Sequence, residues 1–412
     1  MKKFSFAIVC ILIFIFFSCS IPGALDIPEN IDYIKSLAGD PKDSGSWGTI
    51  IDSIPYNIGN TFWINPQTNT TDPQTTRTIS WQSTLDTGEV IIGETHYQAV
   101  TVQDGSQFFH RVDLTGLAAG KTYSYIVGTE GAYSPVYSFT TGSSGDNFSI
   151  LHITDPQIGT GTLKGDSQVW RFLIEAAVKK FPDAAFIVNT GDIVNNAAET
   201  AIPYYFDYAQ KVLANYAFVY SMGNNDNVDW YNKYFTVPQN NYDAGDDTKS
   251  ALYSFDYGNV HFINIDSYTD LKDLQIDWLR NDLKNTDKVW KVAMMHEGCY
   301  GNKNDITSLL DTYNVDLVLA GHEHFYMRSR PMDMAGYYKL NGTVWTIPNV
   351  AGTKYNNLPS PKPAYYVINK QPKLPMFTEI NFSGTTLTLS AYTFDMMTGV
   401  IASFDTYQVS KN

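Results

Sequence analysis

The hydrophobic pattern of this chain changes near residue 145, and the change predicts two folded units of different architecture. Over residues 61–141, short stretches alternate apolar and polar side chains and are rich in Thr, Val and Tyr, which is typical of half-buried strands. Further along, strand-like runs alternate with helical ones, and the first helical run repeats Val169, Leu173 and Ala177 on one face. The sequence therefore predicts a β-sandwich of roughly 80 residues followed by a layered α/β sheet.

Composition agrees with two folded units. The chain has 412 residues, of which 43% are hydrophobic and 17% charged, so it is too long for one ordinary core and too apolar for a disordered protein. Its formal net charge of -14 comes without any dense cluster of Lys and Arg. Because such a surface repels a phosphate backbone, we expect no nucleic-acid partner.

The first residues predict export. Lys2 and Lys3 precede an apolar run over 4–17 that is too short to span a bilayer and ends just before Cys19. A small residue followed by Cys after such a run resembles a bacterial lipoprotein signal. It predicts a lipid anchor at Cys19 and a place in the cell envelope, on the periplasmic or surface side of a membrane. An ordinary secretory peptide cut between Ser18 and Ala24 is the alternative.

Polar clusters follow the predicted strands of the second unit, where loops of α/β sheets normally build sites. Each cluster alone is weak, since a Gly-Asp pair is usually a turn and a His after a strand is usually structural. Together, and in this order, they predict one site. They are Asp155-Pro156-Gln157, Gly191-Asp192, Gly223-Asn224-Asn225-Asp226, His296, and Gly321-His322-Glu323-His324.

This set resembles the calcineurin-like metallophosphoesterases, whose pattern is D-x-H, G-D, G-N-H-D, a lone His and G-H-x-H. Residues 253–262 and 319–331 further resemble purple acid phosphatases, and residues 114–123 resemble a corner of fibronectin type III domains. The resemblance implies an all-β sandwich domain followed by an α/β metallophosphoesterase domain of the four-layer αββα type. The predicted boundaries are a lipoprotein-type signal peptide at 1–19, a tether at 20–55, a fibronectin type III-like domain at 56–142 and a metallophosphoesterase domain at 147–412.

The resemblance also implies a ligand set for two metal ions, divalent or of mixed valence, with Fe, Mn, Zn or Mg as candidates. Two such ions about 3.5–4 Å apart bind phosphoryl oxygens and the attacking hydroxide together. By motif position, one ion takes Asp155, Gln157, Asp192 and His324. The other takes Asp192, Asn224, His296 and His322, so that Asp192 is the bridging ligand.

Two positions depart from the family pattern. Gln157 replaces the His of D-x-H, and the Tyr that purple acid phosphatases supply three residues after the G-D aspartate is Asn195. More important, Asn225 replaces the His of G-N-H-D, which is expected to contact the phosphate and help to protonate the leaving group. Asn225 and Asp226 are therefore the candidate catalytic residues, with the usual acid absent and Asp226 without its usual partner.

The resulting hypothesis is an exported, acid phosphatase-like enzyme that hydrolyses small-molecule or exported phosphate esters, monoesters above all, by attack of metal-bound hydroxide. Two alternatives stay open: a weakly active or inactive metal-binding surface lipoprotein on the same fold, and a phosphodiesterase. The remaining histidines lie in the sandwich or within strands and are predicted to be structural; they are His96, His110, His152 and His261.

Overall fold

A computed structural model describes residues 63–67, 72–238, 252–267, 273–298 and 304–411. The predicted signal peptide and tether, the predicted lipid anchor at Cys19, and the third cysteine, Cys299, lie outside the described residues. Within the described part of the chain, no helix combines the length and hydrophobicity needed to span a membrane.

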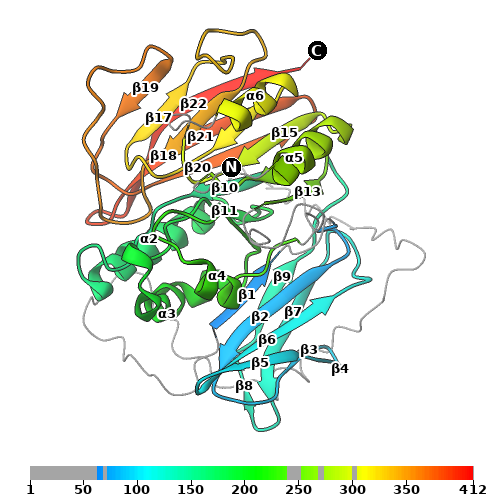
Figure 1. Ribbon diagram of the computed structural model, residues 1–412. Helices are drawn as coiled ribbons and strands as arrows, with labels where there is room; N and C mark the ends of the chain where they lie inside the picture. Colours follow the sequence, from blue (N-terminus) through cyan, green and yellow to red (C-terminus); the bar gives the residue numbers. More distant parts are fainter. Residues whose placement is uncertain (1–62, 68–71, 239–251, 268–272, 299–303, 412) are drawn as a thin grey trace, which may run out of the picture.

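The N-terminal unit is a β-sandwich, as predicted (Figure 1). Ile79 and Trp81 of one layer pack with Tyr123 and Tyr125 of the other in its core. The corner before Tyr123 is closed by a hydrogen bond of 2.8 Å, which the Ala118 backbone N–H donates to the Tyr123 hydroxyl. Its strands are β1 (Trp63–Gln67), β2 (Arg77–Ser83), β3 (Glu89–Ile92), β4 (Thr95–Gln98), β5 (Val100–Asp104), β6 (Gln107–Leu114), β7 (Thr122–Thr129), β8 (Ala132–Tyr133) and β9 (Tyr137–Thr140).

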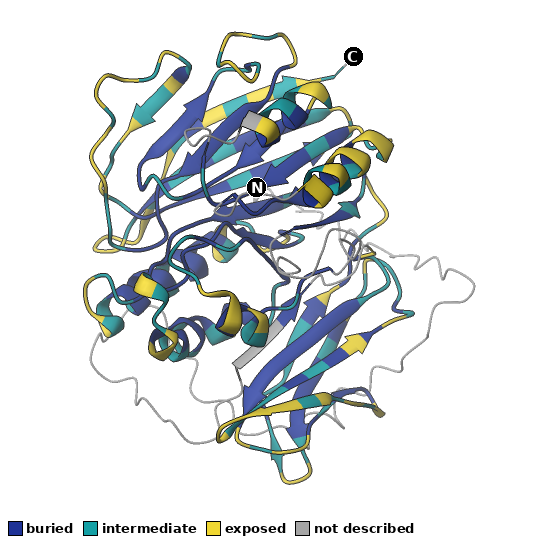
Figure 2. Ribbon diagram, viewed as in Figure 1, coloured by how far each residue is buried: buried dark blue, intermediate teal, exposed yellow. Residues whose placement is uncertain are grey.

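The second unit contains two sheets packed face to face, with helices on both outer faces (Figures 1 and 2). The first sheet contains the parallel strands β10 (Asn147–Ile153), β11 (Ile187–Asn189) and β12 (Phe218–Tyr220), and the antiparallel strands β20 (Met376–Ser383), β21 (Thr386–Asp395) and β22 (Val400–Ser410). The second sheet has the order β13 (Tyr253–Tyr257), β14 (Val260–Asn264), β15 (Trp290–Met294), β16 (Leu317–Leu319), β18 (Val344–Pro348), β17 (Tyr326–Ser329) and β19 (Tyr366–Lys370).

Neighbouring residues of one strand serve different layers, because strand side chains alternate between faces. Leu151 packs under helices α2 (Leu163–Lys180) and α3 (Ile202–Leu213), whereas Ile150 packs between the two sheets. On the far side, Ile263 packs under α5 (Asp273–Asn285) and α6 (Asn304–Thr312). The layers are thus helix, sheet, sheet, helix, and the predicted fold class is confirmed.

The predicted helix around Val169 is α2, and its start is fixed by Thr162, whose hydroxyl accepts the Gly165 backbone N–H at 3.1 Å. Lys179 and Lys180 in its last turn interact favourably with the negative end of the helix dipole. A short helix that the hydrophobic pattern did not predict, α4 (Val228–Tyr234), follows the Asn225 cluster.

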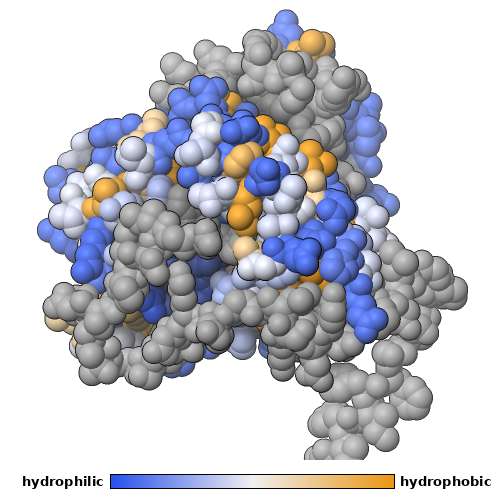
Figure 3. Space-filling view, turned by 90° about the horizontal axis from the view of Figure 1, so that it is seen from below, coloured by the Kyte–Doolittle hydropathy of each residue, from blue (hydrophilic) through white to orange (hydrophobic). Residues whose placement is uncertain are grey.

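The sandwich and the second unit share a sheet. Strand β1 pairs with β2 on one side and runs parallel to β12 on the other, so the sandwich strands β1, β2, β6 and β5 extend the first sheet. Hydrogen bonds reinforce this junction, from the Tyr125 hydroxyl to the Ala214 carbonyl (2.6 Å) and from the Ser138 N–H to the Asn215 side chain (2.8 Å). Seen from below, the part of the surface that the described residues form is mainly hydrophilic, with a narrow hydrophobic strip (Figure 3).

Candidate metal centre

The five polar clusters come together at one edge of the two sheets. Asp155 and Gln157 follow β10, Asp192 follows β11, and the Asn224 cluster follows β12, all three being parallel strands. His296 follows β15 and the His322 cluster follows β16, which are parallel neighbours in the other sheet. The carboxyl ends of these strands therefore bring side chains from five loops to a common place, as expected for an open α/β sheet.

The loops hold an unusual backbone. Five of the predicted site residues have a positive φ that side chains other than Gly rarely adopt: Asp155 (52°), Gln157 (38°), Asp192 (53°), His322 (72°) and His324 (56°). Such strain persists only where the surroundings fix it, and it concentrates at functional sites.

Glycines allow these loops to approach closely. A Cβ on Gly223 would lie 2.3 Å from Asp192 Oδ1, and one on Gly321 would lie 2.0 Å from Thr154 Oγ1 and 2.7 Å from Asp155 Oδ2. The clusters therefore need Gly beside the carboxylates, and this need explains the Gly-Asp and Gly-His pairs.

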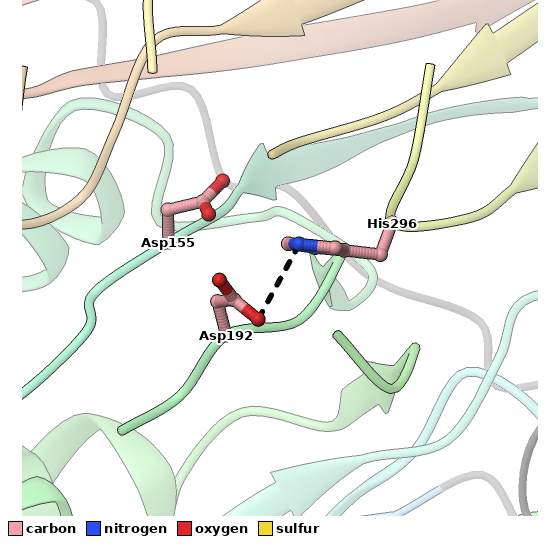
Figure 4. A group of neighbouring side chains, drawn as sticks. All are labelled: Asp155, Asp192 and His296. Carbon is pink, nitrogen blue, oxygen red and sulfur yellow. Dashed lines mark ion pairs between the residues drawn. The ribbon is translucent and has the colours of Figure 1, made fainter. Parts of the chain in front are cut away.

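Asp155, Asp192 and His296 point toward one another from three separate loops (Figure 4). Each offers a ligand atom, these atoms all lie within 4.8 Å of one another, and all three residues are buried. His296 Nε2 lies 3.3 Å from Asp192 Oδ1, and His324 Nε2 lies 3.0 Å from Asp155 Oδ1. Two buried carboxylates and a histidine in this arrangement can hold a metal ion.

The histidines are oriented as metal ligands usually are. His296 Nδ1 is 2.7 Å from the Thr190 carbonyl oxygen, and His324 Nδ1 is 2.9 Å from that of Lys354. A proton on each Nδ1 donates to the backbone, which leaves Nε2 directed at acceptor atoms only. The approach of each Nε2 to these acceptors is stabilised either by a second ring proton or by a cation in the place of that proton.

The electrostatics reflect the same arrangement. Burial opposes a charge on His296, but the Asp192 and Asp155 carboxylates and the Thr190 carbonyl raise the pKa of His296 to about 10. Burial alone would raise the pKa of Asp155, yet the His324 and His296 rings lower it. Burial and the neighbouring His296 lower the pKa of His322.

Amide side chains complete the cluster. Asn224 Oδ1 lies 3.1 Å from His296 Nε2 and 2.7 Å from His322 Nδ1. Gln157 donates its Nε2 to Asp192 Oδ2 at 2.8 Å, while its Oε1 is buried and has no hydrogen-bond partner within the described part of the chain. The structure thus brings together every residue of the predicted ligand set.

The Asp226 carboxylate makes hydrogen bonds that the sequence did not predict. Its carboxylate does not face Asn225; it accepts backbone N–H groups from Asp192 (2.9 Å), Ile193 (2.9 Å) and Gly223 (2.8 Å). Burial and the Asp192 carboxylate raise the pKa of Asp226 to about 7. Asp226 thus lacks the usual His partner, as the sequence indicates, and its carboxylate instead accepts backbone groups that link the loops after β11 and β12.

Several supporting residues were not predicted from the sequence. The carbonyls of Thr190 and Lys354 orient the histidines, and Thr154 donates its hydroxyl to Asp155 at 2.7 Å. Asp166, in the first turn of α2, accepts the Gly161 N–H (2.9 Å) and the Thr353 hydroxyl (2.7 Å), which ties two loops beside the site. Backbone acceptors carry no residue signature, so no sequence signal could have found the carbonyls.

Comparison with known families agrees with this geometry. Residues 148–326 match the model of the family described as Calcineurin-like phosphoesterase, and residues 65–141 match that of the Purple acid Phosphatase N-terminal domain. The chain is a calcineurin-like metallophosphoesterase with a purple acid phosphatase N-terminal domain. For this metallophosphoesterase family, a binuclear metal site is implied.

Individual relatives of this metallophosphoesterase are distant. Purple acid phosphatase 23 of Arabidopsis thaliana is 35% identical over 114 residues, which is 24% of this chain and 24% of the relative. Acid phosphatase type 7 of Mus musculus is 23% identical over 277 residues, 58% of this chain and 60% of the relative. The chain therefore spans about a quarter of the plant relatives that it matches.

Solved structures share the fold. The purple acid phosphatase PPD1 from yellow lupin (Lupinus luteus) has a TM-score of 0.69 at 15% identity, covering 85% of this chain and 74% of its own. The structure of PhoD has a TM-score of 0.63 at 11% identity and covers 87% and 92%. At these identities the likeness concerns the fold alone.

Proposed function

We propose that this metallophosphoesterase hydrolyses phosphate monoesters with two metal ions, outside the cytoplasm. The observation that carries the proposal is the buried Asp155, Asp192 and His296 cluster at the converging strand ends of a phosphoesterase fold. A buried group of carboxylates and histidines whose Nε2 atoms face acceptors is poorly suited to packing alone, and a cation relieves that mismatch.

The side chains present fit such ions. Asp155, Gln157, Asp192 and His324 would hold one ion, and Asp192, Asn224, His296 and His322 the other. The partnerless Oε1 of Gln157 supports this assignment, since turning the amide by 180° would direct that oxygen to the ion and free a lone pair on Asp192. The Gln157 side-chain oxygen is a hard ligand that suits Mn, Fe or Mg, and Zn less well.

Bound ions of this kind lower the pKa of water to near neutrality and neutralise the phosphoryl oxygens. The chain's own residues orient the ligand side chains and hold the loops that carry them. The Thr190 carbonyl fixes the tautomer of His296, the Lys354 carbonyl fixes that of His324, and the backbone donors to Asp226 hold the Asp192 loop.

The chain offers no imidazole for the leaving group at position 225. Because Asn cannot release a proton, general-acid help, typically worth about 10²–10⁴ in rate, is missing there. Wild-type activity is therefore expected to depend steeply on leaving-group pKa, with aryl phosphates cleaved readily and alkyl phosphates slowly. The presence of Asn225 in place of the His of the family pattern also favours the second candidate function, a metal-binding protein with little turnover.

Metal analysis and a phosphatase screen of the purified protein test the proposal. We expect two ions per chain and turnover of p-nitrophenyl phosphate after addition of Mn²⁺, Fe²⁺, Zn²⁺ or Mg²⁺. Faster cleavage of bis(p-nitrophenyl) phosphate would identify a diesterase instead. Bound metal with no turnover of either ester would favour the binding protein, and a protein that binds no metal would refute the proposal.

We also propose export and a lipid anchor at Cys19, supported by the apolar run before that residue. Expression of the full chain in a bacterium should place the wild type in the membrane fraction, and Cys19→Ser should move it to the soluble fraction. Mass spectrometry that finds no acyl chain on wild-type Cys19 would refute the anchor without affecting the phosphatase proposal.

A further inference from the structure

Asn225 holds both oxygens of the central carboxylate. Its backbone N–H donates to Asp192 Oδ1 at 2.7 Å, and its side-chain Nδ2 donates to Asp192 Oδ2 at 2.6 Å. Gln157 Nε2 adds a second donor to the same Oδ2 at 2.8 Å. One residue therefore fixes the rotation of the Asp192 carboxylate, in addition to its distance from the β12 loop.

The remaining polar atoms of Asn225 face away from the cluster. Its Oδ1 accepts the Asn196 backbone N–H at 3.1 Å, and its carbonyl accepts that of Ala197 at 2.8 Å. Asn196 and Ala197 both have a φ of 53°, so this turn is a strained one that Asn225 holds in place. The amide is thus committed at both ends, to Asp192 on one side and to the turn on the other.

The hydrogen bonds also determine which lone pairs Asp192 can offer. A carboxylate has about four acceptor positions, two on each oxygen. Gln157 and Asn225 take both positions on Oδ2, and the Asn225 N–H takes one on Oδ1. The position left on Oδ1 lies on the side of His296, whose Nε2 is 3.3 Å away. Turning the Gln157 amide would free a second position, on Oδ2, for the other ion.

From this geometry we infer that Asn225 is a positioning residue that orients Asp192 for a divalent cation and does not contact the phosphate ester. The inference rests on the proposed function, because it concerns the same metal centre. It assigns to the departure from G-N-H-D a role in metal affinity, in place of the substrate contact that the motif position implies.

The test measures binding of Mn²⁺ alone by equilibrium dialysis to three proteins: wild type, Asn225→Ala and Asn227→Ala. Asn227 is the matched control, because among the described residues its side chain accepts just the Asp229 N–H, at the start of α4. Loss of a residue that orients a metal ligand typically weakens metal binding about 10–100-fold. We expect that loss for Asn225→Ala and an unchanged Kd for Asn227→Ala.

Kinetics separate positioning from substrate contact. With saturating Mn²⁺, Asn225→Ala should regain most of the wild-type kcat with an unchanged KM for p-nitrophenyl phosphate. An unchanged Mn²⁺ Kd together with a raised KM would mean that Asn225 contacts substrate, and would overturn this inference alone. No Mn²⁺ binding by the wild type would overturn the inference and the proposed function together.

A second variant, Asn225→Asp, tests the inference independently in case Asn225→Ala does not fold. Asn225→Asp keeps an acceptor for the Asn196 N–H but places a second carboxylate against Asp192, so its Tm without metal should fall. Mn²⁺ should then raise the Tm of Asn225→Asp by more than it raises the Tm of the wild type. An equal Mn²⁺-dependent shift in the two proteins would overturn the inference.

Discussion

His296 and His261 are both buried beside carboxylates, but the two regions use the ring in different ways. His261 lies on β14 with Nδ1 at 2.8 Å from Asp256 and Nε2 at 2.7 Å from Asp282. His296 contacts a backbone carbonyl with Nδ1, and its Nε2 faces acceptors shared with other residues. The His261 cluster is satisfied by one ring proton on each nitrogen, whereas the His296 cluster leaves one direction for a cation.

The difference shows why burial and a carboxylate neighbour do not alone identify a functional histidine. Burial opposes the charge of His261, yet Asp256 and Asp282 raise its pKa to about 9, so this histidine is positively charged over the neutral range. Asp282 also accepts the Ser254 hydroxyl at 2.7 Å, which ties α5 to the edge of the second sheet. The His261 cluster is a structural ion pair, and the backbone carbonyl on Nδ1 distinguishes His296 from it.

The largest expected effect compares equivalent substitutions in the two clusters. Asp192→Asn should weaken Mn²⁺ binding by more than about 100-fold, because it removes a charged ligand. This loss is larger than the loss of about 10–100-fold that is typical when a residue that orients a ligand is removed. The matched Asp282→Asn should lose stability and keep the wild-type Mn²⁺ Kd. Equilibrium dialysis measures both, and an Asp192→Asn protein with wild-type affinity would refute the assignment of this carboxylate.

The second expected effect concerns stability. His261→Ala removes the cationic partner of Asp282 and leaves it the Ser254 hydroxyl alone of the two, and breaking a buried ion pair from one side typically costs about 3–5 kcal/mol. Because the Asp256 side chain is 44% exposed, the lower figure of about 3 kcal/mol applies. Urea unfolding measures this loss, and the Mn²⁺ Kd should not change; a loss below about 0.5 kcal/mol would contradict the ion-pair assignment.

Much of this contrast lay outside the reach of sequence analysis. The strands and the order of the polar clusters could be predicted, because periodicity and motif spacing are local properties of the chain. The ligand set was implied by the resemblance of those clusters to a known family. The partners of His261 and Asn225 could not, because Asp282 and Asp192 lie far along the chain and meet them only after the sheets form. The same holds for the pairing of β1 with β12, which joins two units that the pattern change near residue 145 separates.

A third prediction concerns the pH dependence of the stability that the His261 cluster provides. The folded pKa of His261 is about 9, above the unfolded value of about 6.5, so its stabilisation is complete below pH 6.5 and is lost as pH rises toward 9. The free-energy difference between wild type and His261→Ala should therefore shrink by up to about 3 kcal/mol across that window. Urea unfolding at steps from pH 6 to 9.5 measures it. A difference that grows with pH would contradict the prediction.

The smallest expected effect concerns an exposed histidine that also contacts a carboxylate. His96 Nδ1 lies 2.9 Å from Glu89, but the His96 side chain is 39% exposed, so water competes with the pair and its net contribution is small. Glu89 also keeps two other donors, the Gln98 amide (2.8 Å) and the Tyr133 hydroxyl (2.6 Å), so His96→Ala leaves no unpaired buried charge. We expect a loss of at most about 0.5 kcal/mol in urea unfolding. A loss as large as that of His261→Ala would mean that contact with a carboxylate, and not burial, determines the contribution of a structural histidine to stability.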